Sequence, residues 1–296
     1  MPIAVAMGEG TGLNMGVLAA AVICGSYFGD NLSMISDTTI GATQGVGAEM
    51  KDKFRINIKI ASIPAILTAI MFFIMGKGEN IASAAVGEYN ILTIIPYFLV
   101  LGLAIIGLDV VLVMTIGIAA VGVIGLATGT GFFTWTAGIS TGMEGMFWLA
   151  VFAMVMAGIM GMVRYYGGLD WMIDKMRKQV RGEKSCEFVI LLIPLLIAIV
   201  IVNSTMTVMI SAPICKELGE KYHVPAKRMA GFIDIGACMG VTLMPHGNGI
   251  LMSAAATGCS YGQIFPYLYY SFFLIIAALI TIGFGLFRDK EDTAKK

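Results

Sequence analysis

Residues 25–39 read Gly-Ser-Tyr-Phe-Gly-Asp-Asn-Leu-Ser-Met-Ile-Ser-Asp-Thr-Thr, a polar stretch between two apolar runs that are rich in small residues. The stretch contains two carboxylates and four hydroxyls, at Asp30, Asp37, Ser33, Ser36, Thr38 and Thr39. Polar groups at membrane depth are costly, and a functional site is their usual explanation. The fold is therefore expected to hold these groups inside a membrane domain.

The composition indicates an integral membrane protein whose main partner is the lipid bilayer. Hydrophobic residues make up 58% of the chain and charged residues 13%, with a mean hydropathy of +0.86. Soluble domains have roughly 45–50% apolar and about 25% charged residues. The formal net charge is zero, so no nucleic-acid partner is expected. The five cysteines are scattered without metal or disulfide spacing, and they are interpreted as packing residues.

No enzyme motif is present in the sequence. It lacks His-Glu-x-x-His, a nucleophile elbow and a phosphate loop. We therefore expect a protein that is not an enzyme, with no cofactor and no metal other than a transported ion.

Apolar runs of about 20 residues predict membrane spans, so the fold class is expected to be an all-α polytopic membrane protein. We expect an interfacial helix over 168–182, where apolar and basic residues occupy opposite faces. The other expected segments are a broken span 14–48, spans 58–75, 91–106, 110–127 and 145–163, a hairpin 186–221, a broken span 228–257 with its break at 244–249, and a span 265–287.

Positive charge indicates how the chain is threaded, because cytoplasmic loops carry the excess of Lys and Arg. If 186–221 is a re-entrant hairpin, every basic residue except Lys77 falls on one side of the membrane. A crossing at this segment would weaken that asymmetry. We therefore predict seven crossings and one re-entrant hairpin in the plasma membrane, with a cytoplasmic tail at 289–296.

The predicted topology contains two related halves of unequal length. Residues 14–75 and 228–287 each form a broken span followed by a whole span, in opposite directions. Inverted repeats with discontinuous helices are typical of secondary transporters. We assign 1–90 to the end of a first repeat and 91–288 to a second. The first repeat lacks a counterpart to 91–227, so we expect either that the chain is a fragment with a missing N-terminal half or that a separate chain supplies the rest. A homodimer is the other assembly considered.

A helix break at Gly29-Asp30 would free backbone carbonyls, which are tolerated at membrane depth where they line a cavity or are buried in protein. Carbonyl, carboxylate and hydroxyl oxygens form a cage that suits Na⁺. A carboxylate in a poorly solvated pocket can also take a proton near neutral pH. Competition between Na⁺ and H⁺ at Asp30 would couple their movements. The alternative is that Asp30, Asp37 or Ser33 only caps the second half-helix.

A second set of polar residues lies in the later half of the chain. We expect the hairpin tip and the second helix break to contribute to a substrate site or second-repeat site, with His246 able to titrate near physiological pH. The alternatives are local hydrogen bonds at the tip and a neutral histidine in a packed turn. The set comprises Asn203, Ser204, Thr205, Asp234, His246, Asn248 and Ser253.

The segment Gly29–Thr39 resembles the signature Gly-Asp-x-x-Ser-Pro-x-Ser-Asp-Thr-Thr of the NhaC-type sodium/proton antiporter family, with Met34 where proline is usual. The resemblance extends more weakly over most of the chain, and it is to the C-terminal part of that family. It implies paired inverted repeats and transport coupled to Na⁺ or H⁺. Carried over by position, it assigns ion binding to Asp30, Ser33, Ser36, Asp37, Thr38 and Thr39.

We therefore predict a secondary active transporter that exchanges Na⁺ for H⁺. The second break departs from the resemblance, because Pro245 is followed by His-Gly-Asn-Gly where related antiporters often have proline followed by tryptophan. That departure leaves open a cation-coupled carrier of an organic anion or amino acid, with a small organic solute as its partner. A passive channel and an inactive assembly subunit are the other classes weighed.

Overall fold

The computed structural model describes residues 1–33, 36–76, 91–106, 108 and 110–287. The described residues form helices and no strand, in agreement with the predicted all-α class. They divide into two compact units, one of residues 1–83 and 152–296 and the other of residues 84–151. Predictions that involve Met34, Lys77, the connection 107–109 between the expected spans 91–106 and 110–127, and the tail 289–296 fall wholly or partly outside the described residues.

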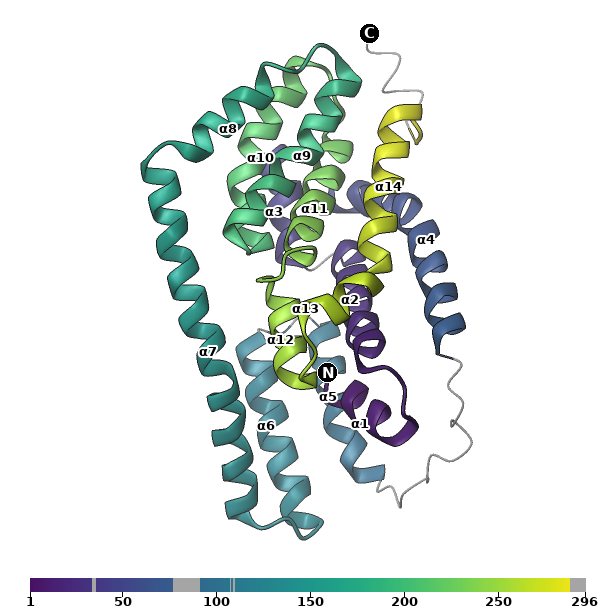
Figure 1. Ribbon diagram of the computed structural model, residues 1–296, viewed down its shortest axis with the longest axis vertical. Coiled ribbons are helices and arrows are strands. Elements are labelled where there is room, and N and C mark those ends of the chain that lie inside the picture. Colours follow the sequence, from purple (N-terminus) through teal and green to yellow (C-terminus); the bar gives the residue numbers. More distant parts are fainter. Residues whose placement is uncertain (34–35, 77–90, 107, 109, 288–296) are drawn as a thin grey trace. The chain divides into compact units, whose positions relative to one another are not determined.

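The larger unit is arranged around α11 (Ala226–Thr242), whose residues 228–242 are all buried. It packs against α9 (Glu183–Ile201), α10 (Ser204–Lys221) and α3 (Asp37–Val46) (Figure 1). Side chains added at Gly236 and Gly240 would collide with the backbone of α9. Small residues four apart allow two membrane helices to approach this closely.

The remaining helices of the larger unit complete the surroundings of α11. They are α1 (Pro2–Thr11), α2 (Met15–Leu32), α4 (Met50–Met75), α8 (Gly168–Arg177), α12 (Asn248–Thr257), α13 (Tyr261–Ile264), η3 (Phe265–Tyr267) and α14 (Tyr269–Phe284). In the smaller unit, η2 (Ile91–Ile94), α5 (Ile95–Ile106) and α6 (Val110–Ala127) pack together. The helix α7 (Phe132–Tyr165) has residues in both units.

Two helices are longer than the spans expected from the sequence. The span expected at 145–163 lies within α7, which begins at Phe132. Its hydroxyls bond to carbonyls one turn back, as Thr136 does to Phe132 (3.2 Å) and Thr141 does to Ala137 (3.0 Å), so the polar groups are satisfied within the helix. The span expected at 58–75 begins at Met50, which brings basic residues into α4.

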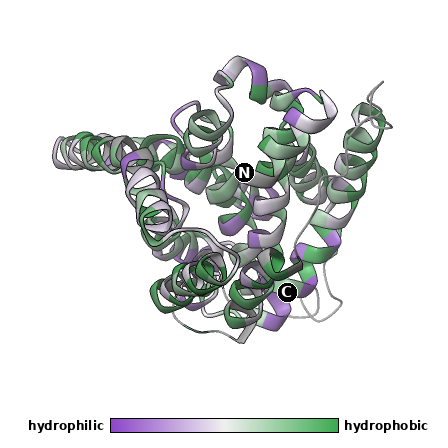
Figure 2. Cartoon of the chain, turned by 90° about the horizontal axis from the view of Figure 1, so that it is seen from below, coloured by the Kyte–Doolittle hydropathy of each residue, from purple (hydrophilic) through white to green (hydrophobic). Residues whose placement is uncertain are grey.

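The apolar character of the helices extends to their outer surfaces, and Figure 2 shows hydrophobic residues along most of their lengths. On α4, Ile63, Ile66 and Phe73 are each more than half exposed. By length and hydropathy, three helical segments among the described residues can cross a membrane: Met15–Val46, Met50–Met75 and Glu183–Ile201. A fourth is the bent pair Tyr261–Tyr267 and Tyr269–Phe284, with a 47° bend. The chain is thus a multi-pass membrane protein.

The predicted seven crossings exceed what these criteria give for the described residues. One reason is that α5 has 12 residues, fewer than the ~20 that a span needs. The segment predicted to be a hairpin is indeed two antiparallel helices, α9 and α10, joined at Val202-Asn203 (Figure 1). Its re-entrant path, the inverted repeat and the incomplete first repeat stay predictions.

Candidate functional site

The first helix break lies three residues later than predicted. The helix α2 continues through Gly29 and Asp30 to Leu32, and α3 begins at Asp37. Ser36 is the N-cap of α3, where its Oγ accepts a hydrogen bond from the backbone N–H of Thr39 (3.2 Å). A serine cap stabilises the start of a helix by satisfying an orphan N–H, which explains why the chain restarts there. Asp30 therefore lies in the last turn of α2.

Asp30 faces side chains from two other helices across this break. Its Oδ2 accepts a hydrogen bond from Thr38 Oγ1 (3.3 Å) at the start of α3 and lies 3.2 Å from Cys238 Sγ of α11. Thr38 and Cys238 are buried, while Asp30 is half-buried. The Ser36 hydroxyl lies 2.9 Å from Thr38 Oγ1, so two hydroxyls extend the polar cluster.

Asp234 is the second carboxylate of the cluster, and it is fully buried at the centre of α11. Its Oδ2 pairs with Lys53 Nζ at 2.6 Å and accepts a hydrogen bond from Asn57 Nδ2 at 3.2 Å. One ligand atom each from Asp30, Asp234 and Cys238 lie within 4.8 Å of one another. The two carboxylates therefore belong to one site rather than two.

The end of α2 is tied to α4 by the same side chains. The backbone carbonyl of Asn31 accepts hydrogen bonds from Lys53 Nζ (3.2 Å) and Asn57 Nδ2 (3.1 Å). Carbonyls at a helix C-terminus lack intrahelical partners and carry partial negative charge, which a lysine satisfies. Asn31 Nδ2 also donates to the hydroxyl of Tyr270 on α14 (3.3 Å). Contacts from α4 and α14 thus hold the end of α2 in place.

Sequence reasoning missed Lys53 and Asn57, because the basic residues at 51–59 were assigned to a cytoplasmic loop. Lys53 is in fact 1% exposed and belongs to α4. The four-residue spacing of Lys53 and Asn57, on the face that carries Ile56 and Ile60, was the available signal. Cys238 was interpreted as a packing residue. Its position one helical turn after Asp234 was the available signal for a place in the site.

The structure brings together only part of the predicted ion-binding set. Asp30, Thr38, Thr39 and Ser36 line the break, and the Ser33 carbonyl accepts a hydrogen bond from Thr39 Oγ1 (2.9 Å). Asp37 is exposed at the first position of α3. Of the second-repeat set, Asp234 joins the cluster.

The other members of the second-repeat set lie outside the cluster. Asn203 caps α10 by accepting a hydrogen bond from the N–H of Met206 (2.9 Å), and Ser204 and Thr205 follow it at the hairpin turn. His246 Nε2 lies 3.1 Å from the Ile199 carbonyl of α9. Asn248 is exposed at the start of α12, and the buried Ser253 hydroxyl donates to the Gly249 carbonyl.

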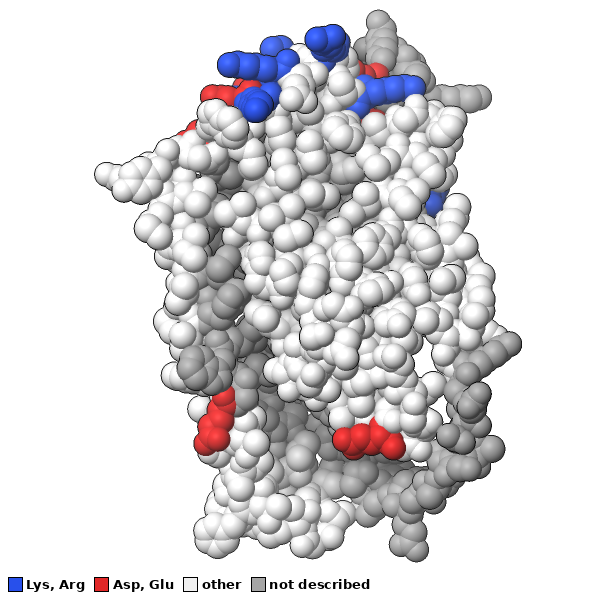
Figure 3. All heavy atoms as spheres, viewed as in Figure 1, with Lys and Arg blue, Asp and Glu red and all other residues white. Residues whose placement is uncertain are grey.

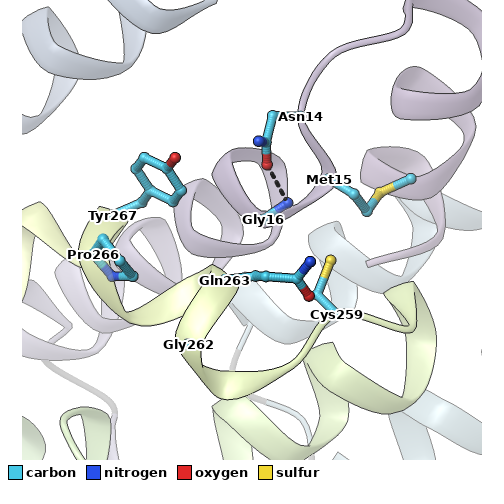
Figure 4. A pocket seen from close by; sticks show the side chains of 8 residues that line it. All are labelled: Asn14, Met15, Gly16, Cys259, Gly262, Gln263, Pro266 and Tyr267. Atoms are coloured by element: carbon cyan, nitrogen blue, oxygen red, sulfur yellow. Dashed lines mark hydrogen bonds between the residues drawn. The ribbon is translucent and has the colours of Figure 1, made fainter.

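A separate cavity of about 450 Å³ opens between the start of α2 and the α13–η3 segment (Figure 4). Its lining includes Asn14, whose side chain bends back to the N–H of Gly16 (2.8 Å). Among the residues that the structure describes, no charged one lines it. The cavity is therefore distinct from the carboxylate cluster.

A family model described as the Na⁺/H⁺ antiporter family matches residues 1–77 and 78–288. The chain belongs to this family. The antiporter NhaC of Alkalihalophilus pseudofirmus is 23% identical, over 94% of this chain and 67% of that protein. The arginine/ornithine antiporter ArcD of Halobacterium salinarum is 23% identical, over 99% and 68%.

The malate-2H⁺/Na⁺-lactate antiporter of Bacillus subtilis is also 23% identical, over 98% of this antiporter-family chain and 69% of that protein. The chain thus spans about two thirds of the length of these relatives. No solved structure matches it. The resemblance noted at Gly29–Thr39 is confirmed at the level of the family, and the relatives are named as transporters rather than enzymes.

Proposed function

We propose that this chain exchanges Na⁺ for H⁺ across the membrane, with Asp30 as the carboxylate that takes either ion. The observation that carries the proposal is the difference between the two carboxylates of the cluster. Asp234 is buried and held by Lys53, whereas Asp30 is half-buried, and no lysine or arginine in the described part of the chain pairs with it. Asp30 is thus the carboxylate open to an exchanged cation.

The neighbours of Asp30 suit both loaded states. A threonine hydroxyl can donate one hydrogen bond and accept two, so Thr38 can donate to the carboxylate or turn its lone pairs toward Na⁺. Carboxylate, hydroxyl and carbonyl oxygens are ligands that hard cations prefer. Because Na⁺ and H⁺ compete for one carboxylate, each ion is carried across the membrane only when the other has left that carboxylate. The ends of α2 and α3 meet at a short break, and movement there would open the site to one side of the membrane and then to the other.

The charge distribution supports an orientation. Figure 3 shows that most Lys and Arg side chains visible on this face gather at the end of the larger unit where α8, α9 and α10 meet. Cytoplasmic segments carry such an excess. We place this end, and the C-terminus that follows α14, in the cytoplasm.

An organic solute is the second candidate, because relatives at the same identity are named for arginine and ornithine or for malate and lactate. The second-repeat set, with Asn203 and His246, would supply its polar contacts. The lysine of the cluster is already engaged by three acceptors, which disfavours a carboxylate-bearing substrate there.

Purified protein in proteoliposomes decides between these candidates. An outward Na⁺ gradient should drive proton entry, measured with a trapped pH dye, without any organic solute. Saturable uptake of labelled malate, lactate, arginine or ornithine, with no Na⁺-driven proton movement in their absence, would instead establish the organic carrier.

A further inference from the structure

Lys53 is a buried charge with every hydrogen-bond donor in use. Its ammonium group contacts Asp234 Oδ2 (2.6 Å), Thr39 Oγ1 (2.6 Å) and the Asn31 carbonyl (3.2 Å). An ammonium has three donors and no acceptor, so these three partners satisfy it completely. The side chain is 1% exposed and leaves no hydrogen free for water or a substrate. Lys53 is therefore a fixed part of the site.

The charges of the cluster define what else it can hold. Asp30 and Asp234 contribute two negative charges, and Lys53 contributes one positive charge that is bound to Asp234. A buried charge is costly unless it is compensated. One monovalent cation or one proton at Asp30 completes the balance, whereas a divalent cation would leave an excess positive charge beside a buried ammonium.

The ligand geometry alone would not impose this choice. Two carboxylate oxygens and a thiol sulfur within 4.8 Å of one another are a donor set that also suits a divalent metal. We propose that Lys53 is the specificity-determining residue of this site. Its ammonium group supplies one of the two positive charges that a divalent cation would bring, and it thereby restricts the site to one monovalent cation. This inference rests on the proposed function only in taking Asp30 as the carboxylate of the exchanged ion.

Replacing Lys53 should therefore create a divalent site. In Lys53→Gln the cluster carries two uncompensated negative charges, and Mn²⁺ should bind the purified full chain at least tenfold more tightly than it binds the parent. Free Mn²⁺ is measured by its electron paramagnetic resonance signal. The double variant K53Q/D234N restores a single negative charge and should lose the added Mn²⁺ binding. Lys51→Gln, an exposed lysine on the same helix, is the matched control and should behave like the parent.

A second variant covers the case in which Lys53→Gln does not fold. Thr39→Asp keeps Lys53 and places a third carboxylate beside its ammonium, so the net charge again becomes two negative charges. This variant should also gain Mn²⁺ binding. If Lys53 were only a packing residue, its replacement would not increase Mn²⁺ binding. A general loss of stability would not produce an increase in Mn²⁺ binding that Asp234→Asn reverses either.

The proposal is overturned if a folded Lys53→Gln or Thr39→Asp protein binds Mn²⁺ no better than the parent. It is also overturned if the added binding survives in K53Q/D234N. If the parent shows no Na⁺/H⁺ exchange, the proposed function fails, and the Mn²⁺ measurements still test Lys53.

Discussion

Asp30 and Asp234 are chemically identical side chains, but their neighbours place them in different environments. Asp234 is fully buried against a lysine and an asparagine, and a buried charge is costly unless it is paired and hydrogen-bonded. Asp30 has a hydroxyl and a thiol as neighbours and remains half-buried. The difference is set by the helices that meet at the break rather than by the local sequence around either residue.

Thr38 is expected to contribute to Na⁺ affinity through its hydroxyl. Thr38→Val keeps the shape and removes the group that lies 3.3 Å from Asp30 Oδ2. A single hydrogen bond contributes about 1 kcal/mol, so the KM for Na⁺ should rise by roughly fivefold with little change in the maximal rate. Thr43→Val is the control, since its hydroxyl bonds only to carbonyls of its own helix. Equal KM values in the two variants would contradict this role.

At the residue scale, the sequence predicted both carboxylates and Thr38, but not Lys53, Asn57 or Cys238 as their partners. The polar motif indicated Asp30 and Thr38 because such groups are rare in an apolar chain. Lys53 could not be assigned in the same way, since lysines near a helix start are usually solvated. Its burial depends on Asp234, which lies 181 positions later in the numbering and reaches it only through the packing of α11 against α4.

The helices themselves follow the sequence more closely than their boundaries do. Broken pairs were expected at 14–48 and 228–257, and α2–α3 and α11–α12 occupy these segments. The first break was placed at Gly29-Asp30, whereas α2 continues through both residues to Leu32. The decisive signal was instead the cap at Ser36, which a search for Ser-Asp-Thr-Thr as a helix start would have found.

The Ser36 cap should contribute measurably to the stability of α3. Ser36→Ala removes the oxygen that accepts a hydrogen bond from the Thr39 N–H, and loss of such a cap costs about 1 kcal/mol. Denaturant unfolding of the purified protein should detect this loss. Ser26→Ala is the matched change within α2, where the hydroxyl donates to the Val22 carbonyl, and it should have little effect. A Ser36→Ala protein as stable as the parent would argue against the cap.

A buried ion pair near the N-terminus of α11 joins that helix to α9. Arg228 makes two parallel bonds to Glu187, at 2.6 Å and 3.0 Å, and both side chains are 0% exposed. Glu187→Gln should lower the free energy of unfolding by about 3–5 kcal/mol, because it leaves a buried arginine uncompensated. Glu217→Gln breaks the exposed pair with Arg177 and should cost less than about 1 kcal/mol. Similar losses in both variants would show that burial is not the cause.

At the scale of the whole molecule, the composition already predicts a membrane protein, while the path of each helix through the membrane depends on more than hydropathy. The helix α9 is long enough to span a membrane, yet α10 turns back beside it at Val202. Hydropathy reports the apolar character of both helices and not the direction in which the second one runs.

The predicted topology can be tested by cysteine accessibility in intact cells. Lys178→Cys and His223→Cys flank the α9–α10 hairpin and should react with an impermeant maleimide only from the cytoplasmic side. Asn203→Cys, at the hairpin turn, should remain unlabelled from outside, because a re-entrant turn stops within the membrane. External labelling of Asn203→Cys would show that the hairpin crosses fully, and labelling of only one flanking position from outside would exclude the hairpin.

The central claim is that Asp30 alternately holds Na⁺ and H⁺. Its most direct measurement is Na⁺-driven proton movement in proteoliposomes that contain the full chain, with Asp30→Asn compared with Glu49→Gln, an exposed acidic residue at the start of α4. We predict at least a tenfold lower rate for Asp30→Asn, since an amide cannot exchange a proton for Na⁺, and a rate close to the parent for Glu49→Gln. Undiminished exchange in a folded Asp30→Asn protein would contradict the account.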